Sequence, residues 1–287
     1  MRFAFFALLT AASALAQPVA EGLLKLNPDT PLPGFTFGTP AAAPATPLTN
    51  GKRFEQGLPP LKPRVRRHRG GPHKGYLPGT PVRSAPRAET SPIPPTTTNC
   101  VILATYTNGT QYGYVVPKFN AFGEYYQFQP TPDGALSVSF PFSPDSPSEL
   151  SLTVTNYKDT ETWPFFGGIA GYASSNDNFG RESYNYAYLG GTTSTEAGSP
   201  AKQGPNSFTA ASGINKDIET AIWSYDPATT NLTPQWINQD GTAPATTVAY
   251  VQGVLTITGD TNALATTFGS VTPLNLKCVS PATINPA

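Results

Sequence analysis

The chain has 287 residues, with 18 basic and 18 acidic side chains, two cysteines and two histidines. Proline accounts for 17 of the first 99 residues but for only 15 of the remaining 188, so composition divides the chain into an extended arm and one domain. Ten basic residues lie between Lys52 and Arg87, whereas the part from residue 100 onward has a formal net charge of −8. Such an acidic domain disfavours binding to nucleic acids and to anionic membranes, because both require a cationic surface.

The first 16 residues have the three-part pattern of a secretory signal peptide. One positive charge at Arg2 precedes an apolar run, and an Ala-Leu-Ala cleavage site ends at Ala16. The apolar run is shorter than the ~20 residues that a membrane-spanning helix needs. We therefore expect cleavage after Ala16 and a secreted, extracellular protein without a membrane anchor.

Residues 17–98 are expected to form a long disordered arm, because a chain dominated by proline, alanine, threonine and glycine buries too little surface to offset its ordering entropy. Two dibasic pairs in this arm end at Arg53 and Arg67. A kexin-like protease would cleave after both pairs; the alternative is a basic patch that stays attached and binds polyanions. Cleavage at both pairs would release a peptide whose core, residues 58–61, favours polyproline II.

The pattern changes to period two in the expected domain, residues 99–287. Alternation of apolar with small or polar residues is typical of half-buried strands. The expected elements are strands at 135–142, 150–154 and 274–278, a hairpin at 219–238, and one strand at 248–258 with a bulge at Gly253. The nearest helix candidate, Gly213 to Glu219 with Ser212 as N-cap, is short. The pattern predicts an all-β fold: a single antiparallel β-sandwich, jelly-roll-like, or a barrel.

Cys100 and Cys278 bracket almost the whole domain. Two cysteines that close both ends of a secreted domain are expected to form one disulfide, and the alternative is a pair of buried thiols. Two sequons predict N-glycosylation, at Asn108 in a Thr-Asn-Gly turn and at Asn231. Pro234 directly follows the second sequon and disfavours its use.

Three segments, together with the signal peptide, indicate a resemblance to known secreted proteins. They are Lys52-Arg53-Phe54 followed by Gly57–Leu61, then Asn120–Tyr125, and then Tyr186–Thr192. In these segments the chain resembles a group of secreted proteins of mushroom-forming (basidiomycete) fungi, and the resemblance spans most of the chain. It implies secretion and a fungal origin, and it supplies no catalytic residues.

Both histidines, His68 and His73, lie in the arm. The domain therefore lacks the side chain needed for Ser-His-Asp or Cys-His catalysis, for a copper-binding histidine brace and for ordinary His-ligated zinc. No G-x-G-x-x-G motif between a strand and a helix occurs, and no P-loop motif occurs. We expect no cofactor and no metal site.

Carboxylates are the remaining candidates for catalysis. A pair of them could serve a glycosidase, and a glutamate paired with a glutamine could serve a glutamic-protease-like enzyme. Glu124 precedes two tyrosines, an aromatic setting that could raise its pKa. Asp177 and Glu182 lie in the aromatic stretch from Trp163 to Gly191. The simpler interpretation is that all three acids are solvated turn residues.

The same aromatic stretch has the chemistry of a carbohydrate site, because sugar rings stack on Trp and Tyr while Asn and Asp bind hydroxyls. The candidates are Trp163, Tyr172, Asn176, Asp177, Tyr184 and Tyr186. Since Tyr184, Tyr186 and Tyr188 share one parity, they could instead form the core face of a strand. We therefore expect a non-catalytic extracellular or cell-wall protein that is a candidate for binding carbohydrate. The alternatives are a hydrolase with a carboxylate pair and the carrier of a processed peptide.

Overall fold

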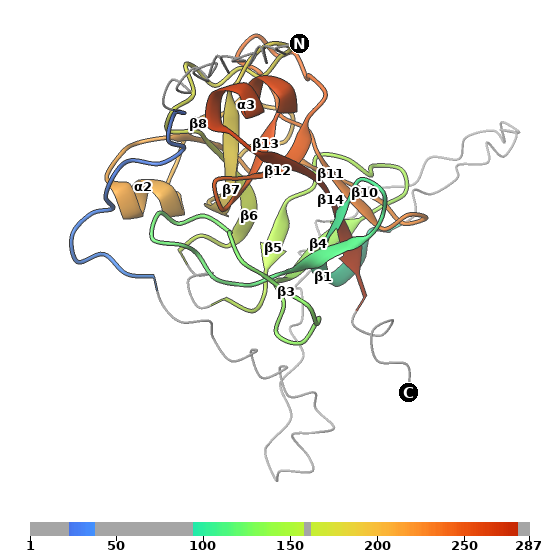
Figure 1. Ribbon diagram of the computed structural model, residues 1–287. Helices are drawn as coiled ribbons and strands as arrows, with labels where there is room; N and C mark the ends of the chain where they lie inside the picture. Colours follow the sequence, from blue (N-terminus) through green and yellow to red (C-terminus); the bar gives the residue numbers. More distant parts are fainter. Residues whose placement is uncertain (1–22, 38–93, 158–161, 281–287) are drawn as a thin grey trace, which may run out of the picture.

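The computed structural model of the chain describes residues 23–37, 94–157 and 162–280 (Figure 1). The predicted cleavage sites after Ala16, Arg53 and Arg67 lie outside the described residues. Signal-peptide removal and dibasic processing therefore stay predictions.

Most of the regular structure consists of strands. They are β1 (Thr96–Tyr106), β2 (Gln111–Val115), β3 (Phe128–Gln129), β4 (Ser137–Phe142), β5 (Leu152–Val154), β6 (Phe165–Ala170), β7 (Tyr186–Thr192), β8 (Lys202–Gln203), β9 (Asp217–Glu219), β10 (Trp223–Asp226), β11 (Asn231–Pro234), β12 (Thr247–Val251), β13 (Val254–Thr258) and β14 (Val271–Val279). Two short helices, α2 (Ser207–Ser212) and α3 (Thr261–Phe268), interrupt them.

Eight antiparallel strands close into a barrel in the order β1, β4, β5, β6, β7, β13, β12 and β14, and β14 pairs back with β1. Further strands extend this barrel: β2 and β3 from β1, β11 and β10 from β14, and β9 and β8 from β6. Closure removes the exposed strand edges that an open sheet would present. The predicted all-β antiparallel fold is confirmed, in its barrel form.

A disulfide ties the two ends of the domain at the seam where β1 meets β14. Ile102 lies opposite Cys278 in this pairing, and Cys100 and Cys278 are bonded with their Cα atoms 5.2 Å apart. The predicted disulfide is thereby confirmed. It fixes the last strand of the barrel against the first.

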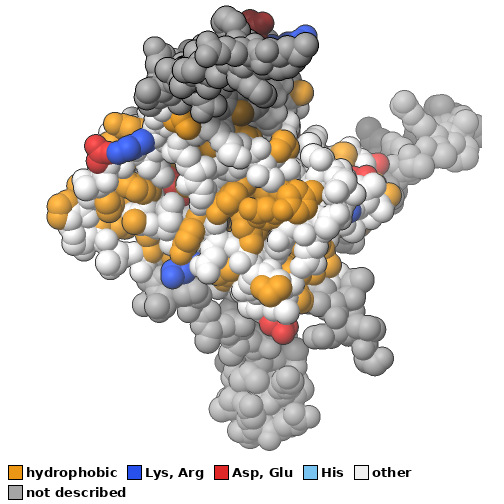
Figure 2. All heavy atoms as spheres, viewed as in Figure 1, with side chains coloured by type: hydrophobic (Ala, Val, Ile, Leu, Met, Phe, Trp, Pro, Cys, Tyr) orange, Lys and Arg blue, Asp and Glu red, His pale blue; other side chains and the backbone are white. Residues whose placement is uncertain are grey.

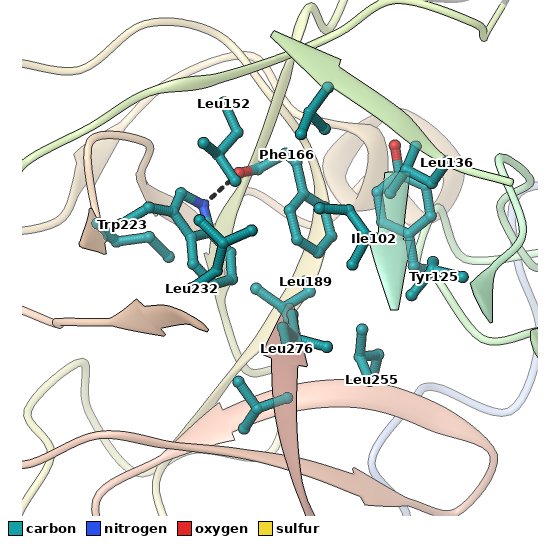
Figure 3. Packing of buried hydrophobic residues seen from close by; sticks show 14 of the residues in the cluster. Ile102, Tyr125, Leu136, Leu152, Phe166, Leu189, Trp223, Leu232, Leu255 and Leu276 are labelled. Carbon is teal, nitrogen blue, oxygen red and sulfur yellow. Dashed lines mark hydrogen bonds between the residues drawn. The ribbon is translucent and has the colours of Figure 1, made fainter. Parts of the chain in front are cut away.

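A single large hydrophobic cluster packs within the barrel (Figure 3). Along β4, Val138 and Phe140 are buried while Ser137 and Ser139 are half-buried, as the period-two pattern predicts. Trp223 lies in this cluster, and its indole N–H donates a hydrogen bond to the carbonyl of a β6 residue at 2.7 Å (Figure 3). The buried polar group of this large side chain is therefore satisfied.

Glycine residues let a loop approach the middle of the barrel wall. Gly190 of β7 forms a bridge with Glu124. A Cβ atom at Gly190 would lie 2.7 Å from the side chain of Ile169 and 3.0 Å from the carbonyl of Gly123. A larger residue at 190 would push this loop away. The glycines of the aromatic stretch thus position the loop that carries Glu124.

The segment from Val248 to Thr258 is a hairpin, so its prediction as one strand with a bulge was wrong. Gln252 and Gly253 form the turn between β12 and β13, with φ angles of 46° and 81°. Two consecutive positive φ angles are typical of a two-residue hairpin turn. Glutamine rarely occupies such a turn, and for this reason the hairpin was not predicted.

The helix prediction at Gly213 to Glu219 was also wrong. Asn206 caps the N-terminus of α2, and Gly213, with a φ of 73°, caps its C-terminus. The glycine thus marks the end of a helix rather than its beginning. Helix α3 was not predicted; Asp260 caps it by accepting hydrogen bonds from two backbone N–H groups.

Residues 23–37 pack against the domain as an irregular segment with bends at Leu26–Asn27 and Asp29–Thr30, which we call the N-terminal segment (blue in Figure 1). For these residues the finding differs from the expected disordered arm, whose residues 17–22 and 38–93 lie outside the described residues. Strand β1 begins at Thr96, before the expected domain start at residue 99. Composition could not predict the contact, because the segment has no periodic pattern and binds a surface formed by residues far along the chain.

Hydrophobic side chains also reach the surface. On the face shown in Figure 2 they gather in a band across the middle, and charged side chains are few. Among the described residues, no helix is long and apolar enough to cross a membrane.

Candidate functional site

The N-terminal segment is anchored on the barrel at Leu26. This side chain is only 1% exposed and belongs to a second hydrophobic cluster, distinct from the one within the barrel. This cluster also contains Tyr186 and Tyr188 of β7, Phe208 of α2 and Phe268 of α3. We call the surroundings of this residue the Leu26 site.

The backbone of Leu26 is also held, by hydrogen bonds to the domain. Its carbonyl oxygen accepts hydrogen bonds from the hydroxyls of Tyr186 at 2.7 Å and Tyr188 at 2.5 Å. Its N–H donates to the side-chain carbonyl of Gln252 at 3.0 Å, and the Gln252 amide donates to the carbonyl of Leu24 at 2.7 Å. The site therefore holds the main chain of the segment by hydrogen bonds in addition to burying an apolar side chain.

The two tyrosine hydroxyls are preorganised as donors. The N–H of Ala173 donates to the hydroxyl of Tyr186 at 3.2 Å, and the N–H of Tyr172 donates to the hydroxyl of Tyr188 at 3.3 Å. Burial raises the pKa of both hydroxyls above the ordinary value, so both stay protonated. Two donors converging on one carbonyl oxygen would also stabilise negative charge on that oxygen.

Glu124 lies beside the anchor and is completely buried. Its Oε2 atom accepts hydrogen bonds from the side-chain amides of Asn27 at 2.9 Å and Asn120 at 2.7 Å. Asn120 also accepts from the N–H of Glu124 through its Oδ1 atom. Ser207 of α2 fixes the loop that carries Glu124, because its hydroxyl donates a hydrogen bond to the carbonyl of Gly123. The segment thus covers the carboxyl from one side and the domain holds it from the other.

Burial raises the pKa of Glu124 to about 7, while the hydrogen bonds from Asn120 and Asn27 oppose this shift. The Oε1 atom of Glu124 and the Oδ1 atom of Asn27 are both buried and have no hydrogen-bond partner among the described residues. A proton on Oε1 would allow Glu124 to donate a hydrogen bond, and Asn27 Oδ1 would be an available acceptor for it. The geometry therefore favours the neutral acid while the segment is bound.

Glu219 of β9 is a second buried carboxyl, and burial raises its pKa to about 8. The N–H of Ile237 donates to both of its oxygens, at 3.1 and 3.0 Å. Glu219 lies opposite Gly168 of β6, whereas Glu124 lies opposite Gly190 of β7. The described contacts of the two carboxyls share no residue, so Glu219 holds the loop at Ile237 against β9 and lies outside the Leu26 site.

The other acids considered from the sequence lie elsewhere. Asp177 is half-buried, and burial followed by the nearby Asp217 raises its pKa. Glu182 is exposed, with a φ of 61°, and its N–H donates to the carboxylate of Asp260 at 2.9 Å. Neither shares a described hydrogen bond with Glu124. Of the three acids, only Glu124 lies at the segment.

The aromatic carbohydrate candidates do not form one exposed platform. Tyr186 is buried together with Tyr188, Tyr184 and Trp163 are half-buried, and only Tyr172, at 40%, is exposed among the aromatic candidates. Trp163 packs against Phe37 of the N-terminal segment, with ring centroids 5.8 Å apart. Asn176 is exposed and orders its own turn by accepting from the N–H of Asn178. Tyr186 and Tyr188 therefore lie on the core face of their strand, which was the alternative to a carbohydrate site.

Leu26 and its polar surroundings Asn27, Asn120 and Gln252 were not among the site residues expected from the sequence. Asn27 lies in the part of the chain assigned to the arm, and Gln252 in the hairpin read as one strand. The only local indication was the leucine-rich run Leu23-Leu24-Lys25-Leu26 within the arm. A leucine-rich run in a proline-rich segment is a weak sign of docking.

No group of three or more His, Cys, Asp or Glu side chains that could hold a metal ion occurs within residues 23–37, 94–157 and 162–280. Comparisons of the chain with protein-family models, with curated proteins and with solved structures found no significant match. The Leu26 site is therefore interpreted from its own geometry.

Proposed function

We propose that the protein is secreted and that its barrel domain is a non-catalytic extracellular protein that binds a peptide segment at the Leu26 site, with a leucine as its buried anchor. The signal-peptide pattern and the disulfide support secretion. In this proposal the N-terminal segment is a built-in occupant of the site.

The observation that carries the proposal is the way in which Leu26 is held. Its side chain is buried, its carbonyl accepts from two tyrosine hydroxyls, and its N–H donates to Gln252. Apolar burial of one side chain combined with main-chain hydrogen bonds is a combination by which domains recognise peptides. The carbohydrate ligand expected from the sequence has less support, because Tyr186 is a core residue, Tyr184 and Trp163 are half-buried, and only Tyr172 of the aromatic candidates is exposed.

Dibasic processing fits this arrangement. Arg53 and Arg67 lie between the N-terminal segment and β1, so cleavage after either would leave the segment attached to the domain by non-covalent contacts alone. Loss of the segment would then uncover the Leu26 site for another peptide. The carrier hypothesis becomes part of the same proposal, because the domain would retain or release its own N-terminal peptide.

A nicked protein tests this proposal. The full chain is secreted from a host without the processing protease, purified, and cleaved in vitro with a kexin-type enzyme. A fluorescent peptide of residues 23–37 should exchange with the bound segment and give a saturable anisotropy signal.

The matched pair for this experiment is Leu26→Asp and Leu24→Asp in the labelled peptide. Leu26 is buried and Leu24 is 49% exposed, so the first change should abolish binding and the second should have little effect. Equal affinities of the two variant peptides would contradict the proposed site. A glycan array that responds while the peptide does not would favour carbohydrate.

A carboxyl hydrolase is the second candidate, supported by one specific arrangement. The carbonyl of Leu26 receives two hydroxyl donors, and Glu124, with its pKa raised to about 7, contacts the next residue. An acid or base with such a pKa next to converging donors resembles the machinery of amide hydrolysis. Nicked protein that cleaves a Leu-Asn peptide, with loss of cleavage in Glu124→Gln, would favour an enzyme.

A further inference from the structure

The turn between β1 and β2 presents the sequon at Asn108 on a well-defined loop. The N–H of Tyr106 donates to the carbonyl of Thr110 at 2.8 Å, and the N–H of Gly109 donates to the carbonyl of Tyr106 at 2.9 Å. Gly109 has a φ of 86°. This is the geometry of a three-residue hairpin loop with a left-handed glycine. The position of Asn108 is therefore set by the hairpin.

The side chain of Asn108 is oriented for modification. Its Oδ1 atom accepts a hydrogen bond from the N–H of Thr110 at 2.9 Å, and both residues are exposed. Its Nδ2 atom, to which an N-linked sugar is attached, makes no hydrogen bond to a described residue. The other sequon differs, because Asn231 is half-buried within β11 and its Oδ1 atom is buried without a partner.

An aromatic cluster lies next to this loop. The ring of Tyr106, which is 40% exposed, lies 5.1 Å from the ring of Tyr112. The ring of Tyr112 lies 4.8 Å from that of Phe128, which in turn lies 5.3 Å from that of Tyr250. We call these four residues the Tyr106 cluster. The exposed ring at the edge of this cluster is that of Tyr106, two positions before Asn108.

We propose that Asn108 carries an N-linked glycan whose first N-acetylglucosamine packs on the ring of Tyr106 and covers the exposed side of the Tyr106 cluster. The inference rests on the proposed secretion, because the donor is a lipid-linked oligosaccharide of the secretory pathway. The bond from Nδ2 to C1 of the sugar forms, the bond from C1 to the lipid diphosphate breaks, and one amide proton is lost.

Position and chemistry both support this contact. Tyr106 and Thr110 pair across the loop, so their side chains project to the same face of the hairpin. One face of the sugar presents C–H groups, which an exposed aromatic ring covers at small entropic cost because the hairpin already fixes both partners. The glycan thus occupies an aromatic surface that would otherwise face water.

Thermal unfolding of the secreted full chain tests the proposal. An endoglycosidase trims the glycan to one sugar, and peptide mass spectrometry reports occupancy at Asn108. We expect the trimmed protein to unfold roughly 2–4 °C above the Asn108→Gln variant, the shift that a modest stabilisation produces in a domain of this size. In a Tyr106→Thr background this difference should disappear.

Tyr172→Thr is the matched control, because Tyr172 is exposed to the same 40% and lies outside the Tyr106 cluster. In the Tyr172→Thr background, the sugar should still raise the unfolding temperature. A secreted protein with unmodified Asn108 would overturn the modification while leaving secretion intact. An equal rise in unfolding temperature in the wild-type and Tyr106→Thr backgrounds would overturn the proposed packing of the sugar on Tyr106.

Discussion

The acid–base chemistry of Glu124 depends strongly on the fold. An exposed glutamate has an ordinary pKa near 4.5, whereas burial beneath the N-terminal segment raises that of Glu124 to about 7. The other charged groups of the segment, Lys25 and Asp29, are exposed and paired with each other at 2.5 Å. Neither changes charge between pH 5 and 8, because the pairing raises the pKa of Lys25 and lowers that of Asp29.

We therefore expect affinity for the segment to fall as pH rises. The carboxyl takes up a proton when the segment binds, so binding is strongest below pH 4.5 and weakens as pH rises through about 7. Full solvation of Glu124 on release of the segment would correspond to roughly two orders of magnitude in affinity, which is the upper limit of the effect. Titration of nicked protein with the labelled peptide 23–37 between pH 4 and 8 measures it.

Glu124→Gln is the control for this prediction. A glutamine amide can donate where the neutral acid does, so the variant should bind across the whole range with little dependence on pH. If the variant retained the pH dependence of the wild type, a group other than Glu124 would control binding.

Gly190 gives a prediction about packing at the same site. A Cβ atom there would lie 2.7 Å from Ile169 and 3.0 Å from the carbonyl of Gly123. Gly190→Ala should lower the free energy of unfolding by about 1–3 kcal/mol. Gly180→Ala, where a Cβ meets nothing within 4 Å, should change it by less than about 0.5 kcal/mol. Urea denaturation of both variants checks the difference, and equal stabilities would contradict close packing at Gly190.

At the scale of elements, α3 depends on its N-cap. The carboxylate of Asp260 accepts from the N–H groups of Asn262 at 2.9 Å and Ala263 at 3.1 Å, and it also accepts from Glu182. Asp260→Ala should destabilise the protein by about 1 kcal/mol, because these groups lose their acceptor. Asp260→Ser should recover much of the loss through its hydroxyl.

The pH dependence of this cap runs opposite to that of Glu124. The backbone hydrogen bond from Glu182, followed by that from Ala263, lowers the pKa of Asp260. The stabilisation is thus present above the ordinary pKa of an aspartate and is lost as pH falls through the lowered value. Unfolding at pH 7 and pH 3 should show a smaller difference between wild type and Asp260→Ala at the lower pH.

At the scale of the whole molecule, the disulfide closes a barrel whose first and last strands pair. The bonded residues are 178 positions apart, and a chain-entropy model assigns a closure of this length a stabilisation of about 5 kcal/mol. Replacing both Cys100 and Cys278 by alanine should lower the free energy of unfolding by about 2–5 kcal/mol. Urea unfolding of the variant and of reduced wild type checks this, and unchanged midpoints would show that β1–β14 pairing alone closes the barrel.

Local patterns predicted the fold class better than the site. Alternation in β4 and β14 identified strands because burial on one face of a sheet repeats every second residue. The hairpin at Gln252 and the helix α3 were missed, since one uses an uncommon turn residue and the other begins with a single capping aspartate. Glu124 was a candidate from its aromatic neighbours, but its partners were not.

The sequence by itself determined the all-β class, the pairing of the two cysteines and the absence of histidine from the domain. Each follows from a local period, a count or a position along the chain. Only the tertiary structure decided that Tyr186 and Tyr188 face the core, that Glu124 is buried, and that residues 23–37 cover it. The physical reason is distance along the chain: Leu26 and Tyr188 are 162 positions apart, and only the closed barrel brings them into contact.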